Sequence, residues 1–189
     1  MNRREALSAV AFLMGGAVVG AQAFLIGCQQ SSSSTEALFS PKAIALLNEV
    51  AETILPGTAN SPGAKEANLG DFIKTMVTDC YEPTDQKTFT DGLTQLQEAS
   101  QAKFNQSFLD LEPAQKHDFI VNLDQEAKKY QKEKAEGQPN HYFTNLKQLT
   151  LLGYFTSEPG ATKALRYLPV PGRYIGCMPY ESGTKAWAM

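Results

Sequence analysis

The sequence has few of the residues that bind metals and redox cofactors. Its 189 residues include two histidines, three cysteines and one tryptophan. It contains no C-x-x-C, C-x-x-C-H or H-E-x-x-H pattern, which excludes the usual signatures of zinc, iron–sulfur and c-type haem sites. The glycine patterns of dinucleotide-binding and phosphate-binding loops, G-x-G-x-x-G and G-x-x-x-x-G-K-S/T, are also missing. We therefore expect no cofactor in this chain.

The sequence also lacks a basic stripe and a catalytic motif. Its 17 basic and 20 acidic residues give a net charge of −3, so nucleic acid is a poor candidate partner. No G-x-S-x-G is present, which argues against a hydrolase of that type. We interpret His117 and His141 as surface residues rather than a catalytic pair. Hydrophobic residues make up 42% of the chain, which is enough for one packed domain.

One long uncharged segment stands near the N-terminus. No charged residue lies between Glu5 and Cys28, and the pair Arg3 and Arg4 precedes the segment. A basic start followed by an apolar, glycine- and alanine-rich run is typical of an export signal. The paired arginines indicate the twin-arginine route, which carries folded proteins. Residues 25–28, LIGC, resemble a bacterial lipobox, in which the Cys28 thiol receives the lipid.

These features divide the chain into three parts. We predict a signal peptide over residues 1–27, a polar tether over 28–40 and a folded domain over 41–189. The alternative is an uncleaved transmembrane anchor, because an apolar run of this length could span a bilayer. The lipoprotein interpretation is favoured because Cys28 stands where the run ends. In both cases we expect an exported domain that is held at a membrane and faces the periplasm.

The domain reads as helices separated by proline and glycine. Apolar residues recur every three or four positions, and Gly92 is the one weak point inside a helical pattern. No alternating strand pattern is present, so the predicted fold class is all-α, a compact domain of five to six helices. The helices predicted by this pattern cover residues 41–54, 69–80, 84–104, 113–136, 142–155 and, for a short sixth, 157–167.

The character of the sequence changes after Leu168. Six prolines and glycines fall within fifteen residues, so neither a helix nor a long strand can persist there. The same stretch is rich in aromatic residues, and we expect it either to wrap the domain or to dock on another protein. Arginine and tyrosine are enriched at binding hot spots. The residues predicted to form the partner interface are Arg166, Tyr167, Arg173, Tyr174, Cys177, Tyr180 and Trp187.

Two cysteines remain if Cys28 carries a lipid. In an oxidising compartment this leftover pair favours one disulfide between Cys80 and Cys177. A bond from Cys177 to a partner subunit is the rival prediction. The third alternative is two buried thiols, since Cys80 lies on an apolar helix face.

Several segments of the domain are familiar as a set. They resemble the gluconate 2-dehydrogenase subunit 3 family, the small subunit of membrane-bound dehydrogenases, from about residue 41 to residue 189, essentially the whole domain. The C-terminal block is the specific part of this resemblance. The segments that carry it are residues 52–58, 61–65, 71–73, 152–162, 165–174 and 176–180.

The resemblance implies a complex of several subunits. A large flavoprotein of the glucose–methanol–choline oxidoreductase type would oxidise a sugar or sugar acid at FAD, and a cytochrome c or similar acceptor would take the electrons. The small subunit would have no redox centre and would support export and maturation of the large one. The lipobox at Cys28 is an additional feature, which suggests that this chain also anchors the complex.

Two hypotheses of different classes follow. The first is a non-catalytic accessory subunit of an FAD-dependent sugar or sugar-acid dehydrogenase that exports, matures and anchors the flavoprotein. The second is a stand-alone periplasmic lipoprotein that binds a partner or ligand through its aromatic C-terminal tail. A flavoprotein that copurifies with the chain would distinguish them.

Overall fold

The computed structural model describes residues 39–170, 172–173 and 176–188 of the chain. The chain separates into two units, residues 1–40 and 41–189, and the second unit contains all of the architecture below. The predicted signal peptide with Arg3 and Arg4, and the predicted lipid site at Cys28, lie outside the described residues. Within the described ranges, none of the helices combines the length and the apolar character needed to cross a membrane.

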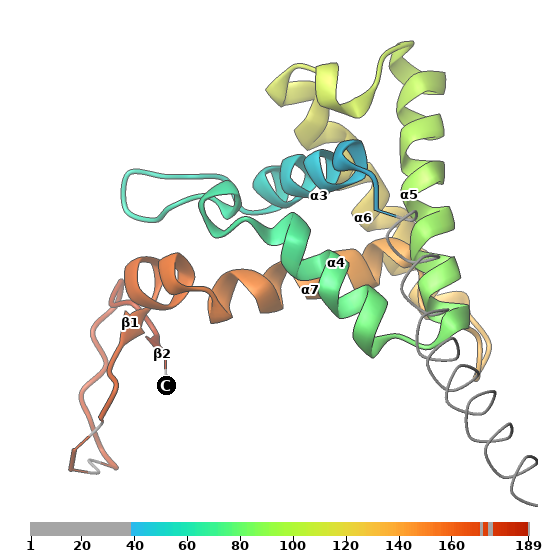
Figure 1. The fold of residues 1–189 in the computed structure, drawn as a ribbon. Helices are drawn as coiled ribbons and strands as arrows, with labels where there is room; N and C mark the ends of the chain where they lie inside the picture. The colour runs from blue at the N-terminus through green and yellow to red at the C-terminus, as the bar shows by residue number, and fades with distance from the viewer. Residues whose placement is uncertain (1–38, 171, 174–175, 189) are drawn as a thin grey trace, which may run out of the picture. The chain divides into compact units, whose positions relative to one another are not determined.

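Five α-helices make up the described domain, so the prediction of an all-α fold is confirmed (Figure 1). They are joined by short connections that contain the 3₁₀ turns η1 (Ala64–Ala67) and η2 (Phe108–Asp110). The helices are α3 (Pro41–Ile54), α4 (Leu69–Cys80), α5 (Pro83–Phe104), α6 (Pro113–Glu133) and α7 (Tyr142–Thr156).

The helix ends follow local sequence signals. Proline occupies the first turn of α5 and of α6, where its missing N–H costs no hydrogen bond. Glu112 caps α6 in a reciprocal arrangement with Gln115, whose side chain accepts the Glu112 N–H at 3.1 Å. Asn105 ends α5 in the left-handed conformation, with φ of 55°. α6 ends at Glu133, before the predicted 136, because Lys134 is already extended.

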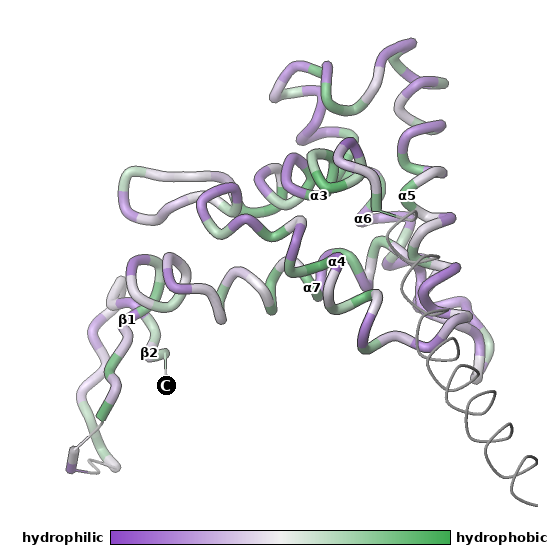
Figure 2. The backbone as a smooth tube through the Cα atoms, in the orientation of Figure 1, coloured by the Kyte–Doolittle hydropathy of each residue, from purple (hydrophilic) through white to green (hydrophobic). Residues whose placement is uncertain are grey.

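α7 is the central helix of the domain. It contacts each of α3, α4, α5 and α6, and its buried side chains lie on several faces rather than on one stripe. The outer helices carry one apolar face each, and Figure 2 shows hydrophobic and hydrophilic residues alternating along them. The fully buried side chains of the core include Leu46, Leu47, Ile73, Val77, Phe89, Leu96, Phe108, Phe143 and Leu146.

Gly92 lies in the middle of α5, and the structure explains its presence there. It is buried, and a Cβ atom at this position would lie 2.1 Å from Cγ and 2.4 Å from Cβ of Tyr142 in α7. The glycine therefore permits the two helices to approach closely. The weak point of the predicted helix is a packing contact rather than a break.

The C-terminal part differs from the predicted sixth helix. A five-residue π-helical turn, η3 (Gly160–Ala164), follows α7, and Leu165 is extended. The chain then forms a short strand, β1 (Arg166–Tyr167), which pairs in parallel with β2 (Trp187–Ala188). The tail thus returns to the point at which it left the domain, a pairing that no alternating pattern in the sequence had indicated.

Candidate functional site

The exposed apolar surface of the protein is concentrated near its C-terminus. Eight large hydrophobic side chains are exposed in the described residues, and seven of them lie between Leu152 and Trp187. Exposed patches of this kind mark interaction surfaces. The side chains are Leu152 and Phe155 of α7, together with Tyr167, Val170, Met178, Tyr180 and Trp187.

The C-terminal loop, defined here as residues 168–186, is closed at its base. The Arg166 N–H donates to the Ala186 carbonyl at 2.8 Å, and the Leu168 N–H donates to the Ala188 carbonyl at 3.4 Å. Above this pairing the guanidinium carbon of Arg166 lies 3.5 Å from the centre of the Trp187 ring. This is the stacked geometry in which a planar cation and an aromatic face attract each other.

The interface residues predicted from the sequence fall into two groups. Arg166 and Trp187 contact each other, whereas Tyr167 is 50% exposed and Tyr180 is 83% exposed. Arg173 is exposed as well. Tyr174 lies outside the described residues, so the structure does not place it.

Charge separates this region from the helical body. Residues 157–188 carry four basic and two acidic side chains, whereas residues 41–156 carry eleven basic and sixteen acidic ones. The C-terminal region is therefore cationic as well as apolar, on an acidic domain. Such a surface complements a partner with apolar pockets and an acidic rim.

The loop between α3 and η1 lies beside the base of the C-terminal loop. Lys185 donates to the backbone carbonyl of Lys163 and, at 3.4 Å, to that of Asn60. The Ser61 hydroxyl lies 3.0 Å from the Tyr154 hydroxyl, which donates to the Pro62 carbonyl. The loop is thus fixed to α7 on one side and to the tail on the other, around a polar pocket of about 450 Å³.

Glu52 occupies the interior of that same loop. Its carboxylate accepts the Gly57 N–H at 3.1 Å and the Lys65 N–H at 2.8 Å. A Cβ atom on Gly63 would lie 2.3 Å from the carboxylate, so a larger residue there would displace the Glu52 side chain from these amide groups. The loop between Gly57 and Gly63 therefore binds the carboxylate of Glu52, a residue of the same chain. The Gly57 and Lys65 amide groups are thus already occupied by this structural ligand.

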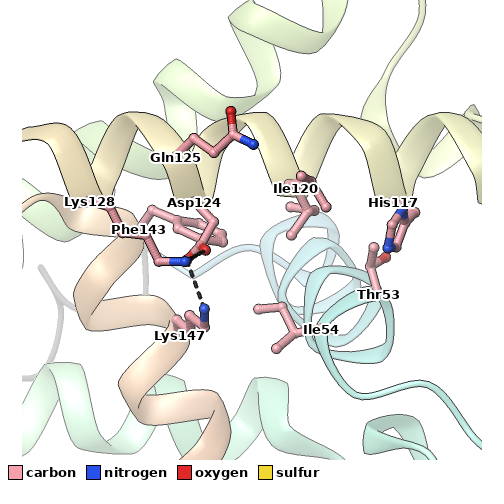
Figure 3. Close-up of a pocket in the computed structure, with 10 residues that line it drawn as sticks. Thr53, Ile54, His117, Ile120, Asp124, Gln125, Lys128, Phe143 and Lys147 are labelled. Carbon is pink, nitrogen blue, oxygen red and sulfur yellow. Dashed lines mark hydrogen bonds and ion pairs between the residues drawn. The ribbon is translucent and has the colours of Figure 1, made fainter.

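A second pocket, of about 280 Å³, lies among α3, α6 and α7 (Figure 3). Asp124 stands at its wall between Lys128 at 2.6 Å and Lys147 at 2.7 Å, and His117 lies at its other end. Partial burial acts to raise the pKa of Asp124, but the two ammonium groups outweigh it and lower the pKa below its usual value. The charged groups here are paired, which favours a structural role.

Glu49 forms a similar bridge in the body of the domain. Its carboxylate joins Lys65 of η1 at 2.6 Å to Lys116 of α6 at 2.9 Å. Burial opposes ionisation, yet the hydrogen bonds and charges of the two lysines lower the pKa of Glu49 below its usual value. The bridge ties three elements together next to the loop that Glu52 holds.

The two histidines have different surroundings. His117 is largely exposed, with its Nδ1 atom 3.5 Å from Asp118. His141 is partly buried, stacks on Tyr142 and caps α7, because its Nδ1 accepts the Phe143 N–H at 3.2 Å. Burial lowers the pKa of His141, against the opposing charge of Glu126. Within the part of the chain that the structure describes, no group of three or more His, Cys, Asp or Glu residues could hold a metal ion.

Cys80 at the end of α4 and Cys177 in the C-terminal loop are both exposed, with free thiols. This exposure contradicts the alternative of two buried thiols. The two predicted disulfides stay predictions, to be decided by intact mass before and after reduction.

Comparison with known proteins assigns the domain. Neither the curated proteins nor the solved structures contain a match to this chain. Residues 41–172, more than two thirds of the chain, match the family described as gluconate 2-dehydrogenase subunit 3. The match covers α3 to α7 and the start of the C-terminal loop. On this evidence the chain belongs to the gluconate 2-dehydrogenase subunit 3 family.

Proposed function

We propose that this chain is the non-catalytic small subunit of a membrane-associated, FAD-dependent dehydrogenase of the gluconate 2-dehydrogenase type. Its role is to support the export, maturation and anchoring of the large flavoprotein, which oxidises a sugar or sugar acid. FAD belongs to that large subunit, and a cytochrome c subunit is the expected electron acceptor. The family is that of a subunit, so a multi-subunit partner is implied.

The observation that carries the proposal is the exposed surface of the C-terminal region. Seven large apolar side chains and an excess of basic groups lie on it. A domain that acted alone would leave this surface in water, at a cost of about 25 cal/mol for each Å² of apolar area. Docking on the flavoprotein removes the surface from water, and aromatic anchors of this kind dominate protein interfaces.

Export and anchoring rest on the N-terminal segment. Arg3 and Arg4 would direct a folded complex through the twin-arginine route, which suits a partner that already holds FAD. Cys28 would carry the lipid that keeps the complex at the membrane and facing the periplasm. One chain would thus supply the export signal, the anchor and the docking surface.

The test is purification of the tagged full-length chain in mild detergent. We expect a large protein with flavin absorbance to copurify. The matched variant ends at Leu168 and lacks residues 169–189, and it should release the flavoprotein. This variant should keep its helices, because every buried hydrophobic residue found in the described ranges lies at or before Tyr154.

The outcomes separate the alternatives. Loss of the flavoprotein with unchanged circular dichroism supports the proposal. Unfolding of the shortened chain would instead mean that the tail stabilises the domain and that the interface lies elsewhere. Purification of the full-length chain without any flavoprotein would favour the stand-alone lipoprotein.

A further inference from the structure

The α3–η1 loop, residues 55–63, is held in one shape although it adds little to the core. None of its side chains is buried, and most of its residues are exposed. The Ala64 N–H closes the base of the loop by donating to the Leu55 carbonyl at 3.0 Å. Near the tip, the Thr58 N–H donates to the Ser61 carbonyl at 2.8 Å, and the Ser61 N–H donates back at 3.4 Å. Figure 1 shows that the loop extends away from the helices.

Glu52 supports this loop from the inside. Its two carboxylate oxygens accept different N–H groups, Oε1 that of Gly57 and Oε2 that of Lys65. Gly57 precedes the tip of the loop and Lys65 follows its end, so one carboxylate joins the two sides. The Tyr154 hydroxyl of α7 also donates to the Pro62 carbonyl. The loop is therefore tied to α3 and to α7.

The loop and the C-terminal part of the chain together form the polar recess of about 450 Å³. Loop residues and Glu66 lie on one side of it, and Thr162, Lys163 and Lys185 lie on the other. Lys185 joins the two sides, because its ammonium group donates to the carbonyls of Asn60 and Lys163. The recess contains two ammonium groups against the single carboxylate of Glu66. Its net charge is therefore positive.

We propose that this recess receives an acidic side chain of the flavoprotein, and that Glu52 is the positioning residue that keeps the loop in the shape required. The Lys163 side chain is 64% exposed and lies 3.6 Å from Glu66, so its ammonium group is open to a second carboxylate. The loop thus becomes a second docking element, beside the exposed apolar side chains described above. The identity of the partner rests on the function proposed above, whereas the support of the loop by Glu52 does not.

The physical reason for such support is preorganisation. A loop that is ordered only on binding loses conformational entropy at that step, which weakens the affinity. If a loosened loop left one tenth of the molecules in the binding conformation, the apparent Kd would rise about tenfold. Complementary charge adds specificity, because like charges that meet at an interface are strongly unfavourable.

Ala59 provides the test of charge, since it is exposed and lines the recess. Ala59→Glu and Ala59→Gln add side chains of nearly the same size that differ in charge. In the full-length chain, we expect Ala59→Glu to bind the copurified flavoprotein at least about tenfold more weakly than Ala59→Gln. The matched control is Ala135→Glu, an exposed position in the connection that precedes α7. It lies beyond the opposite end of this helix from Tyr154 and should leave binding unchanged.

Glu52→Gln tests the positioning role. It replaces one carboxylate oxygen by an NH₂ group, which cannot accept a hydrogen bond, so one of the two amide groups loses its partner. We expect faster hydrogen exchange at Gly57 or Lys65, unchanged helix content by circular dichroism, and binding weakened about tenfold. A merely structural role would change the exchange without changing the Kd.

The outcomes decide the two parts separately. Equal binding by Ala59→Glu and Ala59→Gln would overturn the acidic partner of the recess. Wild-type exchange rates in Glu52→Gln would overturn the support of the loop, and faster exchange with wild-type affinity would show that the loop is not a docking element. Failure of the wild-type chain to retain any flavoprotein would contradict the proposed function, and the exchange of Glu52→Gln would still decide whether the carboxylate holds the loop.

Discussion

Replacement of Gly92 by alanine tests the packing of the domain most directly. In a solvent-exposed helix this change is stabilising by about 1 kcal/mol, because alanine has the higher helix propensity. Here the added Cβ would lie 2.1 Å from Cγ and 2.4 Å from Cβ of Tyr142. The Tyr142 side chain cannot avoid the new methyl group by rotation, since its own Cβ is one of the obstructing atoms. α5 and α7 would have to move apart.

The magnitude follows from two opposing contributions. Overpacking of a well-packed core costs about 3 kcal/mol at the upper end of its usual range, and the gain in helix propensity offsets about 1 kcal/mol. We expect the free energy of unfolding to fall by about 2 kcal/mol. For a domain of this size that corresponds to a decrease in Tm of roughly 4–8 °C. Urea and thermal unfolding followed by far-ultraviolet circular dichroism would measure both quantities.

Two further variants make this prediction specific. Gln95→Ala changes an exposed residue of the same helix and should alter stability by less than about 0.5 kcal/mol. Gly153→Ala would place a Cβ 2.6 Å from the ring of Phe72, which is only partly buried and can rotate. Its cost should therefore be smaller than that of Gly92→Ala. A Gly92→Ala variant as stable as the wild type would refute the close approach of α5 and α7.

Three other predictions concern pH, export and anchoring. The lowered pKa of His141 means that the folded state binds fewer protons than the unfolded state below about pH 6.5, so stability is present above that pH and is lost as the pH falls. His141→Asn keeps a capping side chain without a titrating group, and its loss of Tm between about pH 7.5 and about pH 5.5 should be smaller than that of the wild type. The double change of Arg3 and Arg4 to lysine should leave both this chain and the flavoprotein in the cytoplasm; normal export of dehydrogenase activity would contradict it. Cys28→Ala should abolish lipid attachment and retain residues 1–27, as measured by intact mass, whereas an unmodified N-terminal mass in the wild type would exclude a lipoprotein.

The helices could be predicted from the sequence because their signals are local. Apolar spacing and the prolines at positions 41 and 113 placed the first residues of two helices, whereas the third was predicted from Thr84 as its cap and begins before it, at Pro83. The predicted sixth helix was wrong beyond Ala164, where the chain becomes extended. The pairing of β1 with β2 joins two-residue segments about twenty positions apart, and strands this short leave no periodic pattern.

The side-chain contacts of the site had an even weaker signal in the sequence. Arg166 and Trp187 were predicted as interface residues because of their chemical type, but nothing local indicates that they stack on each other. Glu52 was part of the segment that carries the family resemblance, yet its role depends on two amide groups beyond the end of α3. Contacts between segments that are distant in the chain arise from the fold, and one sequence cannot specify them.

α7 connects the stability of the domain to the proposed docking surface. Leu146 and Tyr154 of this helix are buried in the core, whereas Leu152 and Phe155 are exposed toward solvent. The hydroxyl group of Tyr154 also holds the loop beside the base of the tail. Because every buried hydrophobic residue of the described ranges lies at or before Tyr154, residues of the C-terminal loop can be replaced at little cost to folding. Its position, in contrast, depends on α7, so a change that moves α7 should weaken partner binding even when it lies far from the loop.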